Sequence, residues 1–178
     1  MSLFRKKSTT KQEAFSEVYK PLHHNLTRFV QNMVWSNEDR KDIINETAMI
    51  AYEKFDAIRD KKAMLSFLFT VASRLIYKYR ERRDRFRTEE YNHDQLIDEK
   101  DSAHVKVEAK ELKEALSKLG LKSQEAIVLF EINGMSIIEI AELQKDSVPA
   151  VKSRLARARE SLRKMFDEKI TNEIGNAI

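Results

Sequence analysis

The sequence predicts an all-helical protein made of two small domains that are joined by an acidic, flexible linker. Three observations predict this class. The 178 residues include only three glycines and two prolines, whereas turn-rich β architectures need more of these breakers. Apolar residues recur at steps of three and four over most of the chain. The net charge is +8 over residues 1–87, −5 over residues 88–116 and +1 over residues 117–178.

The composition also limits the possible functions. The absence of cysteine excludes disulfides and cysteine-ligated metal sites and fits a reducing cytoplasm. The N-terminus is polar and basic, and no apolar run approaches the roughly 18 residues of a membrane span, so we expect a cytoplasmic protein. The asymmetric distribution of charge predicts a polyanionic partner that the chain contacts at two separate places.

The N-terminal domain, residues 1–87, is expected to form three amphipathic helices, near residues 12–35, 37–55 and 64–86. Pro21 falls inside the first helix, where a proline kinks or divides a helix. Ser36 or Asn37 is a suitable N-cap for the second helix.

The second helix is predicted to bury one stripe of side chains, formed by Ile44, Ala48, Ala51 and Phe55. This phase leaves the following side chains available to a partner: Asp42, Ile43, Glu46, Met49 and Ile50. An ordinary amphipathic helix without a partner is the alternative.

The third helix begins apolar and then interleaves aromatic with cationic side chains: Tyr77, Lys78, Tyr79, Arg80, Arg82, Arg83 and Arg85. Aromatic rings stack on bases and cations neutralise phosphates, and single-stranded DNA needs both. Phe67 and Phe69 come before this run. For at least one of them we expect core packing, because aromatic residues at helical spacing usually face the core.

Residues 88–107 show no sustained apolar period and are acidic, so they are interpreted as a linker. Such a segment repels phosphate. It could fold back on the basic helix Arg74–Arg87 and mask it, or it could be a spacer only.

The C-terminal domain, residues 108–178, is expected to contain four helices, near residues 107–119, 124–132, 136–143 and 148–166. Ser136 and Glu139 form a capping box, so a helix begins there. Pro149 falls in the first turn of the last helix, where its missing N–H costs little. The buried stripe of that helix is predicted to be Val151, Leu155, Ala158 and Leu162.

A short helix, a tight turn and a basic helix predict a helix-turn-helix whose second helix can enter a DNA major groove. Arginine can pair with guanine there, while lysine and serine suit phosphates. The residues predicted to contact duplex DNA are Ser147, Pro149, Ala150, Lys152, Ser153, Arg154 and Arg157. The alternative is a plain helical hairpin with a solvated basic face.

The string GMSIIEIAELQKDSVPAVKSRLARARESL, from Gly134 onward, resembles the region-four helix-turn-helix of extracytoplasmic-function sigma factors. Three positions depart from the family pattern. Lys145 replaces the turn glycine, Asp146 replaces an apolar residue and Ala150 replaces a threonine. A positive φ at Lys145 would be mildly strained, so a remodelled turn is possible and the promoter sequence cannot be carried over.

The N-terminal half resembles region two of the same family. The string DIINETAMIAYEK, from Asp42, resembles the helix that docks on the polymerase clamp helices. The resemblance and the helix phase together assign core-polymerase contacts to Asp42, Ile43, Asn45, Glu46, Met49 and Ile50.

The string MLSFLFTVASRLIYKYR, from Met64, resembles the family's promoter-melting helix, and residues 56–63 precede it where the family holds a flipped base. The resulting candidates for the melted promoter are Arg59, Lys61, Lys62, Phe67, Arg74, Tyr77, Lys78 and Arg80.

The resemblance implies a sigma factor, which is not an enzyme and needs no metal or cofactor. Such a protein binds core RNA polymerase and promoter DNA, directs promoter recognition, opening and initiation, and can have an anti-sigma factor as a further partner. The family's linker threads a channel of the polymerase.

Two other functions stay open at this point. One is a helix-turn-helix regulator with an N-terminal sensor domain. The other is an enzyme with a di-iron site, for which Glu90 with His93 and Asp101 with His104 are the only candidate ligand pairs. These pairs lie in the most polar stretch, which does not suit a bundle core, and His23 and His24 are adjacent and so face different ways.

Overall fold

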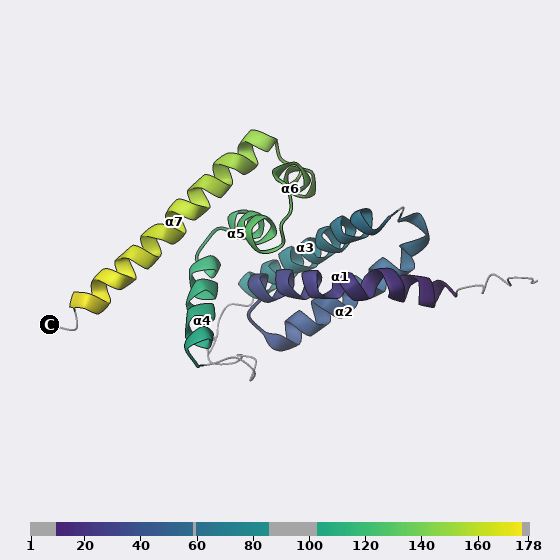
Figure 1. Cartoon of the computed structure of the whole chain (residues 1–178), viewed down its shortest axis with the longest axis horizontal. Helices are drawn as coiled ribbons and strands as arrows, with labels where there is room; N and C mark the ends of the chain where they lie inside the picture. The colour runs from purple at the N-terminus through teal and green to yellow at the C-terminus, as the bar shows by residue number, and fades with distance from the viewer. Residues whose placement is uncertain (1–9, 59, 86–102, 176–178) are drawn as a thin grey trace, which may run out of the picture.

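The computed structural model describes residues 10–58, 60–85 and 103–175, and these ranges are helical with no strand. The elements are α1 (Lys11–Met33), α2 (Asn37–Glu53), η1 (Phe55–Ala57), α3 (Lys61–Arg85), α4 (Ala103–Ser117), α5 (Leu121–Ile127), η2 (Val128–Ile132), α6 (Ile137–Gln144) and α7 (Val148–Gly175) (Figure 1). The predicted all-helical class is confirmed. Among the described helices, none is long and apolar enough to cross a membrane.

The N-terminal domain is a three-helix unit in which α1, α2 and α3 pack against one another. Phe29 of α1 and Phe69 of α3 are fully buried, and their rings meet edge to face with centroids 5.3 Å apart. Phe67 is only partly buried. The expectation that at least one of the two α3 phenylalanines belongs to the core is therefore confirmed, for Phe69.

The predicted N-cap of the second helix is confirmed, α3 begins three residues earlier than predicted, and α1 is not divided. The Ser36 hydroxyl accepts a hydrogen bond from the backbone N–H of Asp39 and caps α2. Thr10 and Glu13 form a capping box at the start of α1. Pro21 is exposed inside α1, which continues past it to Met33.

The predicted phase of α2 is wrong by about one residue. The buried stripe consists of Arg40, Ile43, Thr47 and Ala51, whereas Ile44, Ala48 and Phe55 are only half-buried. Two polar members explain the error, because hydrophobic periodicity ignores them. The buried guanidinium of Arg40 donates to the backbone oxygens of Val34 (2.9 Å) and Trp35 and so fixes the turn between α1 and α2. The Thr47 hydroxyl donates to the Ile43 carbonyl at 2.6 Å.

The C-terminal domain packs α4, α5 and α6 against α7. Val151, Leu155 and Ala158 are buried as predicted, and Leu162 is partly buried against the core. The single helix expected near residues 124–132 is instead an α-helix followed by the π-helical turn η2. Helix α4 begins at Ala103, earlier than expected, so the last residues of the predicted linker are helical. The rest of the linker and the two candidate carboxylate–histidine pairs lie largely outside the described residues.

The two domains are in contact. Helix α1 meets η2 and α4, and α3 meets α6, so the C-terminal domain lies along one side of the three-helix unit (Figure 1). The buried apolar residues form one continuous cluster across both domains. At one edge of this boundary, the Lys113 ammonium of α4 lies 4.9 Å from the centroid of the Trp35 ring.

Lys113 makes the stability of this packing depend on pH. Burial, with a smaller contribution from the nearby Arg40, lowers the pKa of Lys113 to about 7. In the unfolded chain its pKa is about 10.4, so at intermediate pH the unfolded state binds a proton that the folded state has lost, and the stability rises with pH. The Trp35 ring favours the ammonium form, so the slope stays below the limit of about 1.4 kcal/mol per pH unit for one group.

We expect the free energy of unfolding of the natural protein to rise relative to that of a Lys113→Met variant between about pH 7 and pH 9.5. Urea unfolding at a series of pH values measures both. The comparison removes the contributions of groups that the two proteins share. Parallel curves for the two proteins would contradict the prediction.

Candidate nucleic-acid interface

The predicted strand-binding residues in the basic part of α3 fall into two groups. Arg74 and Lys78 are exposed, whereas Tyr77 and Arg80 are half-buried against the C-terminal domain. The Tyr77 hydroxyl donates to Glu125 Oε2 at 3.2 Å. Burial, together with the Glu125 carboxylate, raises the pKa of Tyr77 above its ordinary value. Tyr77 therefore remains a neutral hydrogen-bond donor at physiological pH.

Arg80 is held by groups from both domains. One guanidinium nitrogen donates to the Met33 carbonyl at 2.9 Å and to Gln124 Oε1 at 2.6 Å. Gln124 is itself buried, and its amide donates to the Asn32 carbonyl at 2.7 Å. Two of the predicted contacts to melted DNA are thus engaged in intramolecular hydrogen bonds when the domains are packed together.

Two further bonds join α1 to the segment before the helix-turn-helix. Arg28 donates to the Ile132 carbonyl, and the Asn133 amide donates to the Asn25 carbonyl at 2.9 Å. The first bond satisfies a carbonyl at the end of η2, where the helix ends leave carbonyls without a helical partner, and the second is accepted by a carbonyl of α1.

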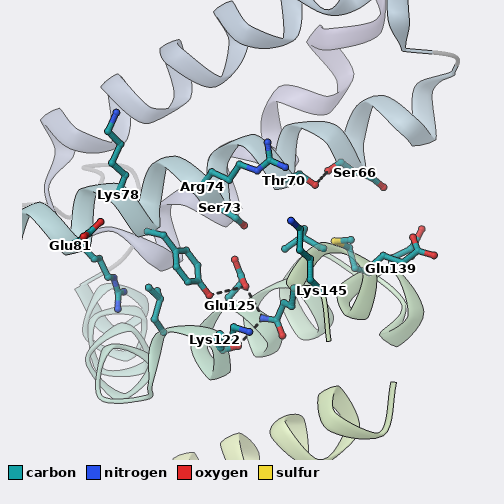
Figure 2. Close-up of a pocket in the computed structure, with 17 residues that line it drawn as sticks. Ser66, Thr70, Ser73, Arg74, Lys78, Glu81, Lys122, Glu125, Glu139 and Lys145 are labelled. Atoms are coloured by element: carbon teal, nitrogen blue, oxygen red, sulfur yellow. Dashed lines mark hydrogen bonds between the residues drawn. The ribbon is translucent and has the colours of Figure 1, made fainter. Parts of the chain in front are cut away.

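A cleft of about 1120 Å³ lies between α3 and the α5–α6 segment. Figure 2 shows Ser73 and Arg74 of α3 facing Glu125 and Lys145 across it. Its charged lining residues are of both signs: Arg74, Lys78, Arg80, Lys122 and Lys145, and Glu81, Glu125, Glu139 and Glu142. Because the carboxylates of α5 and α6 offset the cations of α3, the cleft is not a uniformly positive channel for phosphates.

Three of the predicted strand-binding residues have no described side chain. Arg59 lies outside the described residues, and the side chains of Lys61 and Lys62 are likewise outside the described part of the chain. Phe67 is partly buried against the core, so at most a part of its ring is accessible to a DNA base.

The candidate polymerase-binding face of α2 is mostly accessible. Four of its predicted members are exposed, namely Asp42, Asn45, Glu46 and Met49, the last with 66% of its surface accessible. The assignment of Ile43 is wrong, because this residue is 6% exposed and belongs to the core. Ile50 is half-buried. Asp42 and Glu46 also line a small groove with Lys78 and Arg82 of α3.

The predicted helix-turn-helix is formed by α6, a short turn and α7. Ser136 and Glu139 make the expected capping box. Lys145 has φ 53° and ψ 45°, so the turn keeps the left-handed conformation although glycine is absent. The N–H of Asp146 donates to the Ala141 carbonyl at 2.9 Å and that of Lys145 to Glu142, which together make a Schellman motif.

Most of the predicted duplex contacts lie on the exposed side of α7. These are Ser147, Pro149, Lys152, Ser153 and Arg157, whereas Ala150 is half-buried. The Ser147 hydroxyl accepts from the Ala150 N–H at 3.3 Å and caps the helix. Ala156 was not among the predicted contacts, but it is exposed beside Arg157 and completes the exposed stripe of α7 with Lys152 and Ser153.

Arg154 does not point away from the domain as expected. Its side chain is 15% exposed and donates to Gln144 Oε1 and, at 2.8 Å, to Asp146 Oδ2. Lys122 of α5 contacts the same Asp146 oxygen at 3.1 Å. The hydrogen bonds from Lys122 and Arg154 hold the pKa of Asp146 below its usual value.

Buried polar residues, which the hydrophobic pattern did not indicate, connect these sites. Gln144 donates to Glu125 Oε2 at 2.7 Å and to the Lys122 carbonyl at 2.9 Å. A hydrogen-bonded chain therefore runs from Tyr77 of α3 through Glu125 and Gln144 to Arg154 of α7. One signal in the sequence could have indicated their burial. A Gln-Glu pair directly precedes the apolar run AIVLF, so these two polar residues begin a segment that has no exposed face.

Two family models match the chain in the order and positions of these two domains. Residues 18–86 match Sigma-70 region 2, and residues 109–162 match Sigma-70, region 4. A curated relative, the ECF RNA polymerase sigma factor EcfG of Rhodopseudomonas palustris (strain TIE-1), is 28% identical over 128 residues, which is 71% of each chain.

Two solved structures are similar to the chain over most of its length. The sigma factor RpoE of Bartonella quintana, in complex with the anti-sigma factor NepR, has a TM-score of 0.74 at 22% identity and covers 87% of this chain and 98% of its own. CnrH, in complex with the cytosolic domain of CnrY, has a TM-score of 0.67 at 25% identity and covers 88% of this chain and 90% of its own. The chain belongs to the sigma-70 family and is a sigma factor of the extracytoplasmic-function group.

Proposed function

We propose that this chain binds core RNA polymerase and directs promoter recognition, promoter opening and initiation. The observation that carries this proposal is the pairing of two exposed basic helix faces, on α3 and on α7, in two separate domains of one chain. The two faces suit two forms of DNA. Helix α3 combines cations with aromatic rings for a melted strand, and α7 presents a recognition helix to a duplex.

The docking surface for core polymerase is the exposed face of α2 around Asp42, Asn45, Glu46 and Met49. Carboxylates next to an exposed methionine suit a partner surface that combines basic and apolar side chains. Among the described residues, Met49 is an exposed large hydrophobic side chain, which suits a role in binding.

Binding of a melted strand by Tyr77 and Arg80 requires the two domains to separate, because Glu125 and Gln124 occupy their hydrogen-bonding groups. We propose that the packed form is the resting form and that core polymerase or promoter DNA binds an open form. An anti-sigma factor is proposed as a partner of the packed form, since the similar structure of RpoE was solved with such a protein.

The first prediction concerns docking. Replacing Glu46 with lysine should weaken binding to core polymerase by roughly 10-fold or more, because a reversed charge is placed inside the proposed contact. Helical content should stay unchanged, since Glu46 is exposed. Fluorescence titration of the labelled full-length variant with core enzyme gives the affinity. Glu17→Lys, an equal charge reversal at an exposed position of α1, is the matched control and should bind normally. Normal binding by the Glu46 variant would place the docking surface elsewhere.

The second prediction concerns the duplex. Within the holoenzyme, Arg157→Ala should weaken binding to the upstream element by about 1–3 kcal/mol and relax the preference at one base pair, if Arg157 reads a base. Lys152→Ala should weaken all sequences equally, since lysine at this position suits a phosphate.

Arg163→Ala serves as the matched control for these duplex variants. It removes an exposed arginine of the same helix that is paired with Glu160 beyond the proposed contact. Unchanged affinity and unchanged base preference in the Arg157 variant would rule out this face of α7 as the reading surface.

A further inference from the structure

The turn of the helix-turn-helix has an unusual residue in its left-handed position. Lys145 has φ 53°, a conformation that glycine adopts freely and that a side chain disfavours. The backbone bonds of the Schellman motif satisfy the end of α6 but do not remove this preference against a side chain. Something else in the sequence has to keep the turn in place.

The neighbouring Asp146 carboxylate connects three elements at this point. Its Oδ2 accepts from Arg154 of α7 at 2.8 Å and from Lys122 of α5 at 3.1 Å, and the residue itself belongs to the turn. The same guanidinium donates to the buried Gln144 at the end of α6. The start of α7 is thereby tied to the end of α6 and to α5.

Arg154 has little capacity left for DNA in this arrangement. Its side chain is 15% exposed, and its two terminal nitrogens both donate within the domain. A bidentate contact to guanine requires two parallel donors on one accessible edge. To make that contact, Arg154 would have to leave Gln144 Oε1 without this donor and leave Asp146 with Lys122 alone.

We propose that Asp146 and Arg154 are positioning residues that hold the recognition helix at the angle at which α7 contacts DNA, and that Arg154 does not read a base. The inference rests on the duplex-binding function proposed above. It explains two departures from the family pattern together, because Asp146, in place of an apolar residue, compensates for Lys145 in place of the turn glycine. The lysine introduces the unfavourable conformation, and the aspartate holds the turn closed through Arg154 and Lys122.

The test uses the holoenzyme and a duplex library that is randomised over the upstream element, and it measures both affinity and preferred sequence. Asp146→Ala and Arg154→Ala should each weaken binding roughly 10-fold for every sequence, with an unchanged order of preference. The double variant should be no weaker than the single variants, because the two residues act as one unit. Arg154→Lys, which keeps the cation but not the planar pair of donors, should retain the natural preference.

A rescue experiment separates positioning from contact. Glycine adopts the left-handed conformation without a penalty, so Lys145→Gly in the Asp146→Ala background should restore the affinity to within about twofold of the natural protein. Lys145→Ala in the same background removes the same charge but leaves a side chain at positive φ, and it should stay weak. Circular dichroism of each variant verifies that the domain is folded.

The inference is overturned if Arg154→Lys or Arg154→Ala changes the preferred base at one position, or if glycine and alanine at position 145 behave alike. The Arg157→Ala variant tests the proposed duplex binding separately. If that variant matches the natural protein in affinity and preference, the duplex function fails and the positioning role falls with it. If Arg157→Ala is impaired while Arg154→Lys shifts the preferred base, the function stands and only the positioning role is wrong.

Discussion

The need to satisfy two buried polar side chains, Gln124 and Glu125, is the constraint on which the arrangement of the two domains depends. They are 2% and 1% exposed at the start of the apolar part of α5. Burying an amide and a carboxylate without partners is costly, so their bonds must be made inside the molecule. Arg80 and Tyr77 of α3 supply donors to this pair, and Gln144 supplies another from α6. If the two domains slid past each other, Gln124 would lose its donor Arg80, and Glu125 would lose Tyr77 and keep only Gln144 as a donor.

The same bonds make the domain boundary suitable for opening. A hydrogen bond with one charged partner, such as Tyr77 to Glu125 or Arg80 to Gln124, contributes a net of only about 1.5–3 kcal/mol, because water replaces the partner when the surfaces separate. The polar groups at this boundary therefore fix how the two domains are oriented while they are packed, but they add little to the free energy needed to separate them. The helix-turn-helix is tied to this boundary through Gln144, which contacts both Glu125 and Arg154. Separation of the domains removes the Tyr77 hydrogen bond from a network that reaches the recognition helix.

Local patterns in the sequence were sufficient to predict most of the helices, the caps of α2 and α6 and the core stripe of α7. They failed where polar residues are buried. Arg40 and Thr47 occupy core positions of α2 that a hydrophobic pattern does not count, and this moved the predicted phase and misplaced Ile43. By its spacing, Arg154 belongs to an exposed basic face, but its hydrogen bonds to Gln144 and Asp146 hold the side chain against the domain. The contacts of α3 with α5 and α6 join residues more than 40 positions apart and have no periodic signal, so no reading of single helices could predict them.

The absence of cysteine allows a direct test of the central claim, because a pair of introduced cysteines can be spin-labelled specifically. Suitable sites are the exposed Lys41 of α2 and Lys164 of α7, away from the domain boundary. The distance between the two labels in the free protein should show one narrow distribution. Adding Tyr77→Phe and Arg80→Ala, which remove the donors to Glu125 and Gln124, should broaden the distribution and lengthen the mean distance. A narrow and unchanged distribution in that variant would contradict the claim that these bonds set the arrangement of the domains.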